Sequence, residues 1–292
     1  MKFINWLSRI DRRVIFILVT LVVLIPLLLR IPIPFEVGKQ VRDAYDAIEK
    51  LPAGSVLMLS VDYDATSSPE CQPMLDAMTA HAFRKDLKIL LVGHIVQGLP
   101  LGQMGIERIA AEYNDRNVKE YEKTGNPHFH KEYGKDYLYL SYNPGYTAVM
   151  VGLGREIRDF YPSDYKGVSV DSFPIMKNVH NYNDIALLVS YAHGPIVDAW
   201  VEFAGGRFGQ KIIAGVTGVN APGLYTYIQS GQLVGLVGGL KGASEYESLL
   251  GKPGAASGGM PAQSTAHILI IVLILIGSAA DFAVDIFQRR KK

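Results

Sequence analysis

Two long apolar runs lie near the two ends of the chain, and between them short apolar runs alternate with amphipathic stretches. The first long run, residues 14–29, holds no charge and continues past Arg30 through an apolar stub to Phe35. A bilayer core about 30 Å thick needs roughly 20 apolar residues as a helix, and Arg30 can snorkel to an interface. Residues 14–35 are therefore predicted to be a transmembrane helix, and an uncleaved one, because no small-residue cleavage site follows.

The second long run, residues 264–287, predicts another transmembrane helix. Near its end Asp281 and Asp285 follow helical spacing toward Arg289, which indicates a row of ion pairs rather than a proton relay. Basic residues lie outside both runs: Lys2, Arg9, Arg12, Arg13, Arg289, Arg290, Lys291 and Lys292. The positive-inside rule then predicts a two-pass cell-membrane protein with both termini in the cytoplasm.

This pattern divides the chain into five predicted parts. They are a cytoplasmic interfacial helix at 1–13, a transmembrane helix at 14–35, an extracytoplasmic α/β domain at 36–263, a transmembrane helix at 264–287 and a cytoplasmic basic tail at 288–292. The stretch 252–261, rich in glycine and alanine, is expected to be a flexible tether between the domain and the second span.

Five apolar runs in the central part have the length and composition of buried strands, and a helical pattern follows each of them. The runs are residues 56–61, 88–93, 137–142, 184–191 and 211–216. Strands that alternate with helices predict an α/β fold of Rossmann or flavodoxin type, with a mainly parallel sheet and helices on both faces. One domain is favoured over two lobes divided at the irregular stretch 161–183.

A glycine-rich stretch, residues 231–251, allows two interpretations. Gly231, Gly235 and Gly239 are four residues apart, so on one helix they would form a bare stripe for homo-oligomerisation. Alternatively, residues 233–237 form a sixth strand, and a glycine turn leads from it into a helix. The sequence leaves both open.

Composition narrows the function classes. Hydrophobic residues at 49% and charged residues at 20% suit a globular domain with a small membrane part, not a polytopic transporter. A net charge of +1 gives no electrostatic case for nucleic acid as a partner. Cys71 is the single cysteine, so no intramolecular disulfide forms, and we expect it to be a buried small residue.

Polar residues follow the predicted strands at their carboxyl ends, where open parallel sheets bind ligands. The candidates for ligand binding are Asp62, Asp64, His94, Asn143, His193 and Asn220. Asp62 and Asp64 alternate along a strand, so they are expected to point the same way and to hold a divalent cation or a polar ligand. The alternative is that all six are ordinary loop residues and helix caps.

Other chemical signals are weaker. His128, His130 and Glu132 also alternate, but they lie in a polar stretch that favours a solvent-facing loop over a zinc site. The sequence contains no G-x-S-x-G, H-E-x-x-H or C-x-x-C motif, which argues against an enzyme without excluding one. No metal and no cofactor is predicted.

Three functions remain. The first is a non-enzymatic structural or interaction protein that self-assembles, or docks with a membrane complex, beside the lipid bilayer. The second is a module that binds or senses a small ligand at the strand ends. The third is an extracytoplasmic enzyme using Asp62, Asp64 and His193 as acid, base or metal groups.

Overall fold

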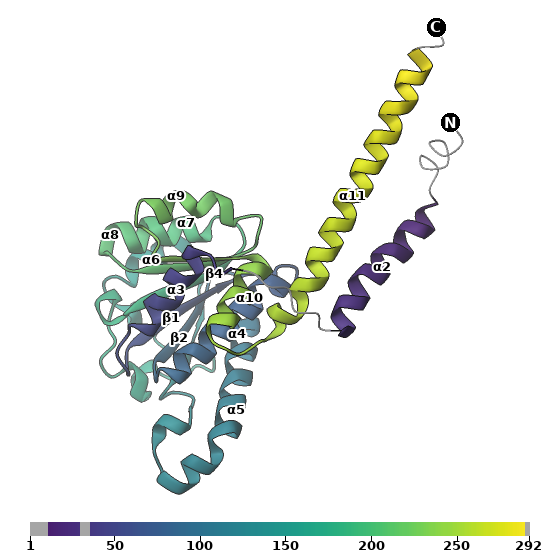
Figure 1. Cartoon of the computed structure of the whole chain (residues 1–292). Helices are drawn as coiled ribbons and strands as arrows, with labels where there is room; N and C mark the ends of the chain where they lie inside the picture. The colour runs from purple at the N-terminus through teal and green to yellow at the C-terminus, as the bar shows by residue number, and fades with distance from the viewer. Residues whose placement is uncertain (1–10, 30–35, 290–292) are drawn as a thin grey trace. The chain divides into compact units, whose positions relative to one another are not determined.

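The computed structural model describes residues 11–29 and 36–289, with the backbone only at residues 280, 281 and 283–289. It divides into a body, residues 36–256, and a second unit that holds the two terminal apolar helices (Figure 1). Residues 1–10 of the expected interfacial helix, the stub 30–35 and the last three basic residues lie outside the described residues, as do the side chains of Asp281, Asp285 and Arg289.

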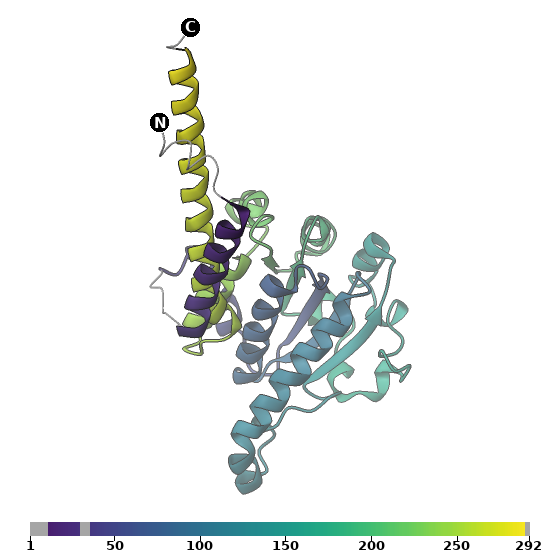
Figure 2. The same cartoon turned by 90° about the vertical axis from the view of Figure 1, so that its right-hand side faces the viewer.

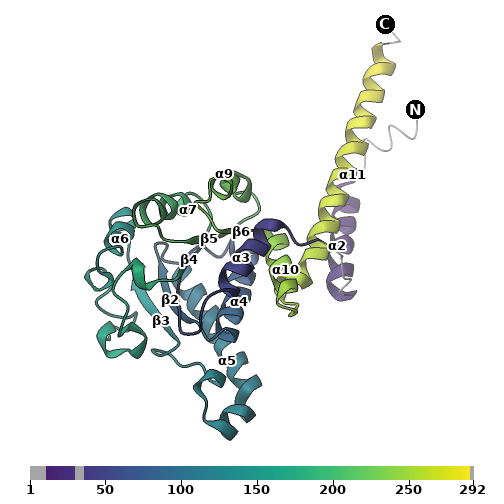
Figure 3. The same ribbon diagram turned by 60° about the vertical axis from the view of Figure 1, so that its left-hand side comes forward.

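The body is built on one six-stranded sheet in which every strand pair is parallel. The strands are β1 (Val56–Asp62), β2 (Lys88–Gly93), β3 (Tyr137–Tyr142), β4 (Leu187–Ala192), β5 (Ile212–Val216) and β6 (Gly235–Gly238). Their order is β3-β2-β1-β4-β5-β6 (Figure 3). The expected α/β fold with a parallel sheet is confirmed, and all five expected strands are present.

One face of the sheet is covered by the long helices of the body. They are α3 (Lys39–Glu49), α4 (Ser68–Arg84), α5 (Gly98–Thr124) and α10 (Gly239–Leu249). Leu57, Leu59 and Val61 of β1 face these helices and are buried with them. The second half of α5 runs on past the sheet, as Figures 1 and 2 both show.

The opposite face carries short helices. They are α6 (Tyr146–Gly152), α7 (Ile196–Trp200), a π-helical turn at Val201–Gly205, α8 (Gly206–Phe208) and α9 (Tyr225–Gln229). α6 ends at Gly152, because the chain folds back and packs the Phe160 ring against this glycine. Since both faces are covered, the strands read as continuous apolar runs.

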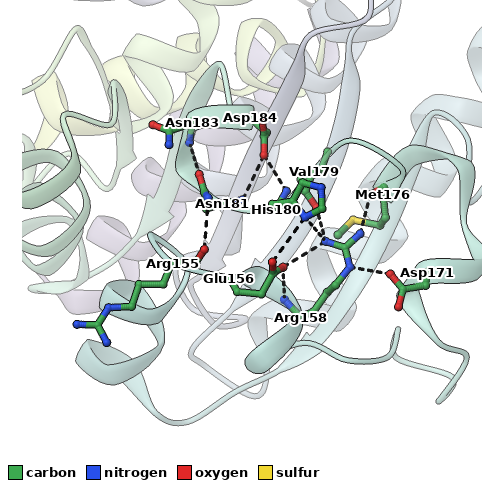
Figure 4. Close-up of polar contacts among 10 residues, drawn as sticks. All are labelled: Arg155, Glu156, Arg158, Asp171, Met176, Val179, His180, Asn181, Asn183 and Asp184. Carbon is green, nitrogen blue, oxygen red and sulfur yellow. Dashed lines mark hydrogen bonds and ion pairs between the residues drawn. The ribbon is translucent and has the colours of Figure 1, made fainter.

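The long connection from α6 to β4 contains four 3-10 turns, at Ile157–Asp159, Val170–Ser172, Pro174–Met176 and Tyr182–Asp184. Arg158 fastens it (Figure 4). Its guanidinium donates to Asp171 Oδ1 at 2.6 Å, to the Val179 carbonyl at 2.6 Å and to the Met176 carbonyl at 2.8 Å. The stretch is therefore irregular in shape but held by specific bonds.

The two outer strands of the sheet are treated differently. Along β3, the Tyr165 N–H donates to the Tyr139 carbonyl at 3.2 Å, and Leu140 and Asp164 form an antiparallel bridge. Residues 164–165 thus occupy part of the outer edge of β3. β6, at the other side, is only four residues long.

The glycine-rich stretch forms a strand followed by a helix, so the single interaction helix with a glycine stripe is wrong. Gly231 lies in a turn with φ of +74°. Gly235 opens β6, and a Cβ there would overlap Ala44 of α3, 2.7 Å from its nitrogen. Gly239 starts α10 with φ of +63°. Each glycine meets a different demand of the fold, and the three share no helical face.

The terminal apolar segments are helical. α2 spans Arg12–Leu29 with mean hydropathy 2.5. α11 spans Ala255–Arg289, and its part Ala255–Ala279 contains an 18-residue stretch of mean hydropathy 1.9. By length and composition both could cross a membrane. The expected flexible tether at 252–261 is largely wrong, because α11 is already helical from Ala255.

Candidate functional site

Asp62, the last residue of β1, is completely buried at the carboxyl edge of the sheet. Its Oδ1 accepts the His94 backbone N–H at 2.6 Å, and its Oδ2 is in close contact with the Ser60 hydroxyl. Trp200 donates its indole N–H to Ser60 Oγ at 3.1 Å. Burial raises the pKa of Asp62. His94 and the hydrogen bonds that the Asp62 carboxylate accepts lower it. Asp62 therefore connects the end of β1 to the residue after β2 directly, and to α7 through Ser60.

His94 follows β2 and is 7% exposed. Its Nδ1 lies 3.1 Å from the Asn143 carbonyl, and a carbonyl only accepts, so Nδ1 carries the proton. In the neutral ring Nε2 is then an acceptor, and it is buried without a partner among the described residues. The ring centroid lies 5.4 Å from that of Trp200 and 5.7 Å from that of Tyr146.

Tyr146 enters the site in an uncommon backbone conformation. Its φ is +40°, in the left-handed region that a non-glycine residue rarely adopts. Burial raises the pKa of its phenol, and the charge of Asp62 adds to this. The loop before it is held by Asn143, whose Nδ2 donates to the Phe160 carbonyl at 3.2 Å and whose Oδ1 accepts the Gly145 N–H at 3.0 Å. Backbone strain of this kind is concentrated at functional sites.

The acidic residues around α4 are occupied by backbone donors. Asp64 Oδ1 accepts the N–H groups of Thr66 at 3.0 Å and Ser67 at 3.2 Å, together with the Thr66 hydroxyl. These bonds, the Thr66 hydroxyl first, hold the pKa of Asp64 below its usual value. Glu70 accepts the Gly218 N–H at 2.7 Å, on the loop that follows β5.

Buried polar atoms without a partner concentrate around this edge. In the described part of the chain they are Thr79 Oγ1, His94 Nε2, Tyr161 OH, Ser190 Oγ, His193 Nδ1 and Thr217 Oγ1. Ser190 pairs in register with Ser60, and the charge of Asp62 raises the pKa of Tyr161 further, after burial. His193 and Thr217 directly follow β4 and β5. Because buried polar groups are normally bonded, these are the atoms whose hydrogen bonds ordered water or a ligand would complete.

The structure brings some sequence candidates together and separates others. Asp62, His94 and Asn143 are linked by hydrogen bonds, and the His193 N–H donates to the Asp62 carbonyl at 3.4 Å. Asp64 turns to the start of α4, because β1 ends at Asp62 and the alternation stops there. Asn220 lies before the 3-10 turn Ala221–Leu224 and its side chain makes no capping bond.

A divalent-cation site at Asp62 and Asp64 finds no geometric support. Within residues 11–29 and 36–289, no group of three or more His, Cys, Asp or Glu side chains is placed to hold a metal ion. Two histidines follow α5 in the polar loop. The His130 ring stacks on the Tyr121 ring with 4.7 Å between centroids, and His128 Nδ1 lies 3.7 Å from Asp86 Oδ1.

Several site residues were missed by the sequence reasoning: Ser60, Tyr146, Tyr161, Ser190 and Trp200. One signal was present, because Ser60 and Ser190 are polar positions inside otherwise apolar strands, and such positions need a partner. Tyr161 and Trp200 reach the site only through tertiary packing.

A separate groove of about 440 Å³ lies between α4, α5, the turn at 127–129 and residues 250–252. It is lined by Ala80, Arg84, Ile109, Glu112, Tyr113, Arg116, Asn117, His128, Phe129, Leu250, Gly251 and Lys252. Its charges are largely paired, as Lys252 with Glu112 at 3.1 Å and Arg84 with Glu49 at 3.3 Å.

Comparison with known proteins gives no relative: no protein-family model, curated protein or solved structure matches this chain.

Proposed function

We propose that the body is a Rossmann-type module that binds a small ligand beyond the carboxyl ends of β1, β2 and β4. The strand order β3-β2-β1-β4-β5-β6 supports this assignment, because it is the order of the doubly wound dinucleotide-binding class. In that class the ligand crevice lies where the order reverses, which here is between β1 and β4.

The observation that carries the proposal is the unpartnered Nε2 of His94. An acceptor nitrogen that is buried without a hydrogen bond costs about 1–3 kcal/mol, and here it lies beside Trp200 and the strained Tyr146. Neighbouring His193 and Ser190 also bury unpartnered polar atoms. A ligand that supplies the missing donors and acceptors would offset this cost.

The same proposal places the module at a membrane. Two helices of sufficient length and apolar character support a two-pass anchor in the lipid bilayer. Basic residues outside both apolar runs support cytoplasmic termini and an extracytoplasmic body. An enzyme that uses Asp62, Asp64 and His193 is less well supported, because Asp62 is fully buried and already bonded to Ser60 and His94.

A second candidate is a structural or interaction protein that binds a membrane partner or a second copy. The groove between α4, α5 and residues 250–252 favours it, since part of its lining is apolar, at Ala80, Ile109 and Leu250. The glycine stripe no longer supports it. Native mass spectrometry of the detergent-extracted chain tests this candidate, and a purely monomeric species without bound protein would contradict it.

The test of ligand binding uses Trp200 as the reporter. The chain contains two tryptophans, so a Trp6→Phe variant reports from Trp200 alone. Native mass spectrometry of the gently extracted protein should reveal a retained small molecule, and adding it back after removal should change Trp200 fluorescence saturably. In His94→Gln the retained molecule should be lost, whereas His128→Gln, at the groove, should keep it. Retention by His94→Gln at the wild-type level would contradict the proposal.

A further inference from the structure

Histidine is the one kind of basic side chain in the loops at the carboxyl edge of the sheet, at His94 and His193. These loops are residues 63–67, 94–97, 143–145, 193–195 and 217–220, and none contains lysine or arginine. The charged residue in these loops is Asp64, and Glu70 of α4 reaches the loop after β5. A phosphate or carboxylate ligand would find no lysine or arginine in these loops to pair with.

Carboxylates of the chain already lie at the starts of two helices, α4 and α10, where such sheets offer backbone donors to anions. Helix N-termini with free N–H groups attract phosphate, but Asp64 already accepts the N–H groups of Thr66 and Ser67 at the start of α4. Glu70 accepts the Gly218 N–H, and its Oε2 lies 3.1 Å from where a Cβ of Gly239 would stand, at the start of α10. An anion would meet a carboxylate at both helices.

The hydrogen-bonding group of the site that still lacks a partner is an acceptor, His94 Nε2, so it can take a donor. His94 is more than nine-tenths buried, its Nδ1–H is used by the Asn143 carbonyl, and its Nε2 lone pair has no partner in the described residues. The indole of Trp200 and the phenol ring of Tyr146 flank the imidazole. An acceptor nitrogen beside aromatic rings, with Asp64 and Glu70 nearby and no lysine or arginine in the loops, suits a ligand that is both cationic and an N–H donor.

From this juxtaposition we propose that the ligand is a small organic ammonium ion that donates an N–H to His94 Nε2 and packs against Trp200 and Tyr146. This inference rests on the ligand-binding function proposed above and names its ligand class. A quaternary ammonium ion lacks the N–H, and a phosphorylated ligand brings the wrong charge.

The experiment uses matched probes on the full chain carrying Trp6→Phe, in detergent at pH 7.5. The probes are n-butylammonium, n-butanol, butyrate and inorganic phosphate, and the readouts are Trp200 fluorescence and thermal midpoint. n-Butylammonium should bind saturably, n-butanol at least tenfold more weakly, and butyrate and phosphate not at all. Asp64→Asn keeps an acceptor oxygen at the start of α4 and should weaken n-butylammonium at least threefold at low salt while leaving n-butanol unchanged.

His94→Gln should weaken n-butylammonium at least tenfold, and His128→Gln should not change it. Equal binding of n-butanol and n-butylammonium, stronger binding of butyrate or phosphate, or no binding of the amine would overturn the ammonium class. The ligand-binding function would survive any of these results if a retained molecule of another class depends on His94. It fails as well only if no molecule is retained and no probe binds.

Discussion

Glu245 and Glu247 stand two residues apart on α10 and hold the two chain segments that enter and leave the body. Glu245, 2% exposed, accepts the Gly38 N–H at 2.9 Å. Glu247, 4% exposed, accepts the N–H groups of Gly254 at 2.8 Å and Ala256 at 3.0 Å. Bonds from backbone N–H groups to carboxylates are charge-assisted and stronger than neutral ones. One helix therefore fixes both ends of the folded body.

Glu247→Gln should destabilise the body by about 1–3 kcal/mol, because the amide keeps one acceptor oxygen and turns a donor group toward Gly254 or Ala256. Urea denaturation followed by Trp200 fluorescence in the Trp6→Phe chain measures the change. Glu122→Gln makes the same substitution at an exposed position near the end of α5, and should stay within about 0.5 kcal/mol of the parent. Equal midpoints for the two variants would show that the Glu247 bonds contribute little.

Stability should fall as the pH is lowered from about 6.5 toward 4. Burial lowers the pKa of His81 from 6.5 to about 4, with its ring between Glu49 at 2.7 Å and the Tyr246 hydroxyl at 2.7 Å. Below 6.5 the unfolded chain binds a proton at His81 that the folded chain does not, and this favours unfolding. The loss is at most about 3 kcal/mol, at roughly 1.4 kcal/mol per pH unit.

Urea midpoints at pH 7 and pH 5 check this dependence. His81→Gln removes the titrating group and should flatten the change, although it also lowers stability at pH 7. The hydrogen bond from His81 holds the pKa of Glu49 below its ordinary value, so that carboxyl titrates below the measured window. An unchanged pH slope in His81→Gln would assign the dependence to another group.

Gly235→Ala should destabilise the body by about 1–3 kcal/mol, because its methyl group would overlap the Ala44 backbone of α3 and force that helix away from β6. Gly223→Ala is the matched control, since no atom lies within 4 Å of a Cβ at that position. The difference between the two thermal midpoints reports the contact. A tolerated Gly235→Ala would mean that α3 is free to move outward at no cost.

Arg158→Lys should loosen the connection between α6 and β4, because one ammonium group cannot reach Asp171, Met176 and Val179 together. Amide hydrogen exchange at residues 174–184 should become about tenfold faster, which corresponds to about 1.4 kcal/mol. Arg155→Lys is the control, because the Arg155 side chain points away from this cluster in Figure 4. Unchanged exchange in Arg158→Lys would show that the 3-10 turns hold the connection without it.

The sheet could be predicted from sequence because its strands are buried on both faces and read as unbroken apolar runs. The long helices α4 and α5 were visible for a similar reason, since each repeats apolar residues at helical spacing. The short helices were not. α6 stops where Phe160 packs on Gly152, and α7 passes into a π turn after Trp200.

Only the location of the candidate site could be predicted from the sequence, not its hydrogen bonds. Parallel strands bring His94 and Asn143 to one edge, which the fold class implies. The sequence could not show that Asp62 is buried against Ser60 and that Trp200 bonds to this serine, since Trp200 follows Ser60 by 140 residues. The expected pair of Asp62 and Asp64 failed because the strand ends between them.

If the chain is anchored in a bilayer, as proposed above, the occupied outer edge of β3 has a consequence. Proteins confined to a surface meet their neighbours far more often than proteins free in solution, and an open strand edge is a template for adding a neighbour's strand. Residues 164–165 already sit against β3, and β6 offers four residues at the opposite side. The fold therefore suits crowding in two dimensions without polymerising edge to edge.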